Sequence, residues 1–126
     1  MKFYFNGKLI RTSKNHEYKY AILSENDGVW SCHSTLEAAE KEYRKPIAAR
    51  ETDIHECMVA IEMLKNGRNY MEVRRGGRWF KVQLKGKDHR GDDKADVATW
   101  EKYIKNDKTA IESLNTRKIV ELEARA

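Results

Sequence analysis

The chain has 126 residues, of which 36% are charged and 40% hydrophobic, and its formal net charge is +5. This length fits one domain with a modest core, so we expect residues 1–126 to form a single domain, and the hydrophobic content argues against a disordered chain. The positive charge favours anionic partners, and a solvated basic surface with no special partner is the plainer alternative.

The chain has no feature that predicts export or membrane insertion. Its N-terminal residues lack an apolar stretch long enough for a signal peptide, and no segment approaches the length of a membrane span. Two cysteines, Cys32 and Cys57, are too few for a disulfide framework. We therefore expect a cytoplasmic protein, without membrane partners, whose thiols are reduced and buried.

Turn signals divide the first third of the chain into short strands. Residues 3–5 run into Asn6-Gly7, a pair suited to the positive φ angles of a tight hairpin, and the chain returns through Leu9 and Ile10. Residues 17–24 alternate in polarity, and a second turn signal at 26–28 precedes residues 29–33. This pattern predicts an antiparallel meander of three or four strands.

The middle of the chain is predicted to be helical. Ser34 and Glu37 have the spacing of a capping box, and an apolar stripe follows them. Pro46 cannot donate to the helical ladder, so it should kink the helix or start a second one, and Asp53 to Glu56 repeats the cap-like spacing. Asn66-Gly67 is a natural stop.

The last third combines a hairpin and a helix. Residues 70–84 predict a second hairpin around Gly76-Gly77, and residues 85–94 form an exposed loop that either closes over a ligand or dangles. A last helix should begin near Asp96, and its terminal apolar strip in residues 117–126 should dock on its own core or on a second copy. The fold class is therefore α+β: an N-terminal antiparallel β-meander packed with a kinked helical segment, a second hairpin and a C-terminal helix.

Motifs that carry catalysis are not apparent in this sequence. It has no nucleophile elbow, no P-loop and no glycine-rich dinucleotide fingerprint, and its acids alternate with bases on helix faces, which is typical of a solvated surface. Cys32 and His33 are adjacent on a strand and point to opposite faces, while His55 and Cys57 are two apart on a helix and diverge. We expect no enzyme, no cofactor and no metal.

Binding of an anion is better supported. Arginine forks onto phosphate oxygens, lysine adds a point charge, tyrosine and tryptophan stack on a base, and a helix start offers free backbone N–H groups. The plainer interpretations are simple helix capping, and a turn with exposed arginines and one core aromatic. The candidate ligand-binding residues are Arg11, Ser13, Lys14, Tyr18, Ser34, Thr35, Arg44, Arg75, Trp79, Arg90 and Arg117.

Two segments carry a resemblance to a known family. They are NGKLIRTSKNHEYKYAI and SCHSTLEAAEKEYRK, and they resemble the N-terminal half of the phage anti-Thoeris sponge proteins of the first type described. The resemblance covers roughly residues 2 to 45, through the order of short strands, the basic hydroxyl turn and the first helix. Beyond Pro46 no residue-by-residue match is found, so the family's pocket residues are not transferred.

The resemblance implies a function. It implies a homodimer or higher homo-oligomer in the host cytoplasm that captures glycocyclic ADP-ribose, a cyclic ADP-ribose isomer made by bacterial TIR-domain enzymes, and holds it intact. Some members also bind cyclic oligonucleotides at a separate site. The alternative is a basic inhibitor or a nucleic-acid-binding accessory protein of a phage, and nucleic acid is the less favoured partner. A small nuclease or hydrolase of cyclic nucleotides is a third possibility, for which no acid–base or metal set is visible.

Overall fold

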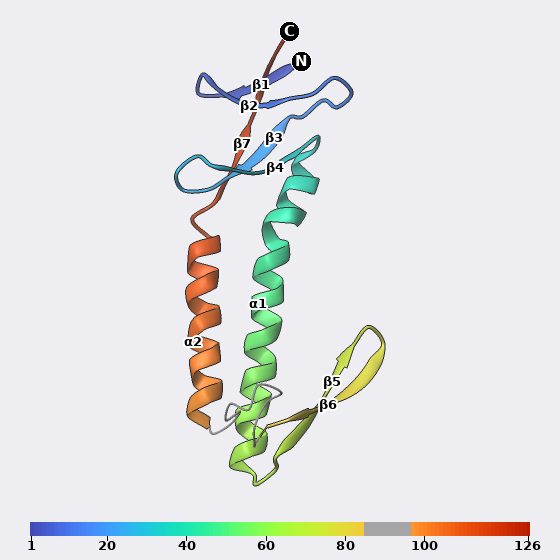
Figure 1. Ribbon diagram of the computed structural model, residues 1–126, viewed down its shortest axis with the longest axis vertical. Coiled ribbons are helices and arrows are strands. Elements are labelled where there is room, and N and C mark those ends of the chain that lie inside the picture. Colours follow the sequence, from blue (N-terminus) through green and yellow to red (C-terminus); the bar gives the residue numbers. More distant parts are fainter. Residues whose placement is uncertain (85–96) are drawn as a thin grey trace. The chain divides into compact units, whose positions relative to one another are not determined.

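A computed structural model of the chain describes residues 1–84 and 97–126. Two compact units are present, one formed by residues 1–48 and 111–126 and the other by residues 49–110. The elements, shown in Figure 1, are β1 (Lys2–Phe5), β2 (Lys8–Thr12), β3 (Tyr20–Leu23), β4 (Val29–His33), α1 (Leu36–Lys65), β5 (Tyr70–Arg75), β6 (Arg78–Gln83), α2 (Val97–Leu114), β7 (Lys118–Glu121) and β8 (Glu123–Arg125). The predicted α+β class with its N-terminal meander is confirmed.

The first unit contains two antiparallel sheets, each built on one of the expected hairpins. The strand orders are β2-β1-β8 and β4-β3-β7. Asn6 and Gly7 both have positive φ, 49° and 77°, as the tight turn between β1 and β2 requires. Ala21 and Leu23 of β3 are fully buried and form a core cluster with Val120 of β7. The meander is thus two hairpins, and each sheet needs a strand from the other end of the chain.

Those completing strands correct the expectation for the C-terminal tail. We expected the apolar strip of residues 117–126 on a terminal helix, but α2 ends at Leu114 and the tail forms β7 and β8. Ala21 pairs with Val120, and Phe3 pairs with Ala124. The β-branched pair Ile119-Val120 favours a strand, and hydrogen bonding of β7 to β3 and of β8 to β1 satisfies the backbone of the tail. Sequence periodicity over so few residues did not reveal this pairing.

The helix α1 is continuous through Pro46, where a kink or a second helix start was predicted, so the prediction of a second start is wrong. Pro46 lies inside it, and Asp53 is an interior position rather than a second cap. The helix is capped by Thr35, whose Oγ1 accepts a hydrogen bond from the Ala38 amide at 3.1 Å. It ends as expected before Gly67, whose φ is +80°. Neither helix of the described residues is long and apolar enough to cross a lipid bilayer.

The second unit pairs the predicted hairpin with helical residues. Strands β5 and β6 are antiparallel around Gly76 and Gly77, both of which have positive φ (Figure 1). One hairpin face, with Met71 and Val73, packs into the core. The same cluster holds Cys57, Ala60, Leu64, Leu84 and Trp100. Alternation along the strands leaves the other face of the hairpin exposed.

Candidate anion-binding site

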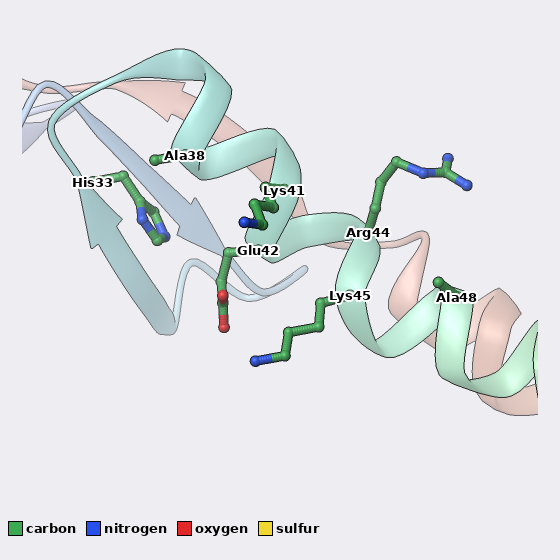
Figure 2. A pocket seen from close by; sticks show the side chains of 7 residues that line it. All are labelled: His33, Ala38, Lys41, Glu42, Arg44, Lys45 and Ala48. Carbon is green, nitrogen blue, oxygen red and sulfur yellow. The ribbon is translucent and has the colours of Figure 1, made fainter. Parts of the chain in front are cut away.

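An open cavity of about 760 Å³ lies beside the first turns of α1. Helical spacing explains its lining, because Ala38, Lys41, Lys45 and Ala48 follow one another at intervals of three or four residues and so share one face of the helix. His33, at the end of β4, adds its ring from the neighbouring strand, as Figure 2 shows. Glu42 and Arg44 complete the lining.

The charge of this lining is mostly positive. Lys41, Arg44 and Lys45 are exposed, and none of them forms a salt bridge with another residue of the described ranges. Like charges at i and i+4, as at Lys41 and Lys45, cost a helix about 0.2–0.5 kcal/mol. The arrangement therefore does nothing for helix stability, whereas it suits an external anion.

The side chains do not all point the same way. In Figure 2, the Lys41 and Lys45 chains extend from α1 toward the side on which the His33 ring lies, while Arg44 extends away from it. The His33 ring is held by a 2.7 Å hydrogen bond between its Nε2 and the Ser31 hydroxyl. Two lysines, the Glu42 carboxylate and a half-buried imidazole thus face one hollow, and Arg44 stands at its margin.

Four of the predicted residues, Arg11, Ser13, Lys14 and Tyr18, lie at a different place in the same unit. Ser13 and Lys14 line a smaller hollow of about 180 Å³. The guanidinium of Arg11 stacks on Tyr18, with Cζ 5.4 Å from the ring centroid. These residues do not line the larger cavity, so the structure brings the predicted set together only in part.

The predicted helix-start residues make structural bonds. The Ser34 hydroxyl donates to the Glu17 carbonyl at 2.7 Å, which ties the start of α1 to the chain before β3. Thr35 supplies the cap of the helix. Both side chains are used locally, and they adjoin His33 without lining the cavity themselves.

Arg117 is buried, with 6% of its surface exposed, in a cage of neutral groups. Its Cζ lies 4.5 Å from the Trp30 ring centroid and 4.3 Å from that of Tyr43. Nε donates to the Leu114 carbonyl at 2.8 Å and Nη2 to the Tyr43 carbonyl at 2.6 Å. The predicted ligand-binding arginine therefore joins the end of α2 to α1 and β4.

The remaining predicted residues belong to other parts of the chain. Arg75 pairs with Glu56 at 2.9 Å. Trp79 is 66% exposed and lines a hollow of about 320 Å³ with Arg68 and Tyr70. Arg90, and the proposed lid of residues 85–94 that contains it, lie outside the described residues.

Of the seven lining residues only Arg44 was predicted from the sequence, and the residues that were missed include His33, Lys41 and Lys45. The signal was present, because Lys41 and Lys45 lie on one helical face, but the alternating acids around them indicated a solvated surface. Glu37 and Glu40 precede Lys41 and Arg44 by four residues, yet none of these acids forms a salt bridge within residues 1–84 and 97–126. Charge order alone did not reveal that the cations are unpaired.

Comparisons with known proteins add no information about this site. No protein-family model, curated protein or solved structure matches the chain.

Proposed function

We propose that the chain is a non-catalytic sponge that binds a phosphate-bearing nucleotide signal in the cavity beside α1 and holds it intact. The observation that carries the proposal is a pair of unpaired lysines on one helix face, Lys41 and Lys45, with unpaired Arg44 at the margin, beside a cavity of about 760 Å³. This volume falls in the range of small-molecule sites.

The lining suits a pyrophosphate joined to apolar or ring-bearing groups. Lysine ammonium groups provide point charges for phosphate oxygens, and the imidazole of His33 adds a hydrogen-bonding partner. Ala38 and Ala48 leave room on the helix surface on either side of the charged positions. A preformed site of this kind favours capture, because little ordering has to accompany binding.

The identity of the ligand comes from the family resemblance. It implies glycocyclic ADP-ribose, a product of bacterial TIR-domain enzymes, so the proposed role is evasion of host defence by a phage in the host cytoplasm. A homodimer or larger assembly, and a separate site for cyclic oligonucleotides, belong to the same proposal. Light scattering after gel filtration measures the assembly, and a monomer at all concentrations would contradict that part.

Calorimetric titration with glycocyclic ADP-ribose tests the proposal. We expect saturable binding to the wild-type chain and a loss of about 10- to 100-fold in affinity for the double variant Lys41→Ala/Lys45→Ala, since each charge-assisted hydrogen bond contributes about 1.5–3 kcal/mol before solvent screening. The matched control is Lys102→Ala/Lys108→Ala, which removes two exposed lysines of α2 and should bind as the wild type does.

The fate of the captured ligand separates a sponge from an enzyme. After binding, the protein is denatured by heat and the mass of the released molecule is measured by mass spectrometry. Recovery of unaltered glycocyclic ADP-ribose agrees with sequestration. An altered mass, or no binding in the titration, contradicts the proposal.

A second candidate function, binding of single-stranded nucleic acid, is favoured by the exposed face of the β5–β6 hairpin. Cross-strand partners share a face, so the register places Tyr70, Arg74, Trp79 and Lys81 together, and all four are exposed. Lys81 Nζ lies 4.3 Å from the Tyr70 ring centroid. Exposed rings with adjacent cations are the elements of a base-stacking surface.

A gel-shift series at increasing salt tests this second candidate. Binding through phosphates should weaken steeply with salt, and Arg74→Ala should weaken it while Arg78→Ala, on the opposite face of the hairpin, should not. Indifference to single-stranded and duplex DNA at low salt would eliminate it.

A further inference from the structure

Three potential metal-ligand atoms meet in the second unit, away from the cavity described above. Asp53 and Cys57 are four residues apart on α1 and share a face, and Asp107 reaches them from α2. One ligand atom from each residue lies within 4.8 Å of the other two. Cys57 and Asp107 are 2% and 3% exposed, whereas Asp53 is exposed and gives the cluster access to solvent.

Asp107, a member of this cluster, has an unsatisfied side-chain oxygen. Its Oδ1 accepts a hydrogen bond from Arg50 at 3.0 Å, but its buried Oδ2 has no hydrogen-bond partner in the described part of the chain. Leaving such an acceptor unpaired costs about 1–3 kcal/mol, and more when it is charged. A buried carboxylate oxygen beside a second carboxylate therefore requires either a proton or a cation.

The surroundings show the same need for positive charge. Among the described residues, the charged groups facing the carboxyl of Asp53 are Asp107, Glu56 and Arg50, and Arg50 is the single cation of this set.

We propose that Asp53, Cys57 and Asp107 bind a divalent cation of the zinc class, with a solvent molecule as the fourth ligand. One sulfur and two carboxylate oxygens suit Zn²⁺ and Co²⁺, while Mg²⁺ and Ca²⁺ take oxygen ligands. The 3.9 Å between Cys57 Sγ and Asp53 Oδ2 is compatible with two ligands of one tetrahedral ion after a small adjustment.

Arg50 supports the same site from outside. Its hydrogen bond to Oδ1 holds the carboxylate of Asp107 in place, as partners of metal-binding carboxylates commonly do. Binding displaces the Cys57 thiol proton to solvent, because the thiolate is the ligand. This proposal is independent of the anion-binding cavity, and either one can fail without the other.

Titration of the full, reduced chain with Co²⁺ tests the site, because a cobalt–thiolate bond gives a charge-transfer absorption band that carboxylates alone do not. We expect the band to saturate at one ion per chain, to vanish in Cys57→Ser and to persist in Cys32→Ser, which removes the other free thiol. Absence of the band, or its loss in Cys32→Ser, overturns the proposal.

A second variant guards against misfolding of the first. Asp53 is exposed in the interior of α1, so Asp53→Asn should keep the helical circular dichroism of the wild type. Its Zn²⁺ affinity, measured by competition with a chelating dye, should fall about 10-fold or more, in line with the loss of one charged ligand (about 1.4 kcal/mol per 10-fold). Unchanged affinity would overturn the proposal.

Discussion

Two stretches of α1 gather like charges, and burial makes them behave differently. Lys41 and Lys45 project into an open cavity, where water screens their repulsion to a few tenths of a kcal/mol. Asp53 lies beside Asp107, which is 3% exposed and has lost that screening. Exposed lysines of like charge therefore stay available for an external anion. A buried carboxylate beside a second carboxylate instead has to be neutralised within the protein by a proton, an arginine or a metal ion.

The largest expected effect comes from the buried cation Arg117. Arg117→Ala should lower the free energy of unfolding by about 3 kcal/mol, because the carbonyls of Leu114 and Tyr43 each lose a side-chain donor and two rings lose a stacked guanidinium. Urea denaturation measures the change. Arg125→Ala, an exposed arginine paired with Glu123, is the control and should cost less than about 1 kcal/mol. Equal costs would contradict the role assigned to burial.

The next effect concerns the arginine that faces Asp107. In the presence of a chelator, Arg50→Ala should destabilise the chain by about 1–2 kcal/mol, because it leaves a buried carboxylate unpaired. The side chain of Arg50 is 51% exposed, which keeps this below the cost of breaking a fully buried pair.

The matched control for that variant is Arg75→Ala, which breaks the more exposed pair with Glu56. Its cost by the same denaturation measurement should stay below about 1 kcal/mol. Equal destabilisation of the two variants would show that the burial of Asp107 does not set the strength of its ion pair. That result would contradict the contrast drawn between buried and exposed charges.

The exposed lysines should show almost no effect on stability. Lys41→Glu places a carboxylate four residues before Lys45 but also four residues after Glu37, so the two pairings should offset each other and the stability of α1 should change by less than about 0.5 kcal/mol, while capture of glycocyclic ADP-ribose weakens. Thermal unfolding and calorimetry on the same sample measure the two effects. Loss of stability, or undiminished binding, would show that Lys41 has a structural role instead.

Much of the fold was predictable because its signals are local. The turns at Asn6-Gly7 and Gly76-Gly77 and the stop at Gly67 depend on φ angles that few residues adopt, so the sequence marks them. The strand at Lys118–Glu121 was missed because its partner, β3, lies about a hundred positions earlier in the chain.

The candidate site was less predictable than the fold, since exposure and pairing are tertiary properties. Arg117 has the same chemistry as Arg44, but one is caged and the other is exposed at the margin of the cavity. Helical spacing does place Asp53 and Cys57 together. Asp107, however, reaches them from a second helix, and no local sequence pattern predicts that contact.

The smallest effect is expected at the exposed pair of Asp27 with Lys118. The hydrogen bond from Lys118 lowers the pKa of Asp27 from its ordinary 3.8. A lowered pKa contributes stability above 3.8, and this contribution is lost as the pH falls through the folded-state value. The difference in urea midpoint between wild type and Asp27→Asn should therefore be small at neutral pH and disappear in acid. A difference that persists in acid would not be electrostatic.

The most direct test of the central claim locates the bound anion. A series of amide nuclear magnetic resonance spectra of the ¹⁵N-labelled chain, recorded during titration with glycocyclic ADP-ribose, reports the change at every backbone position. The account predicts saturable shifts concentrated at His33, Ala38, Lys41 and Lys45. Shifts confined to the β5–β6 hairpin, or no shifts at all, would contradict it.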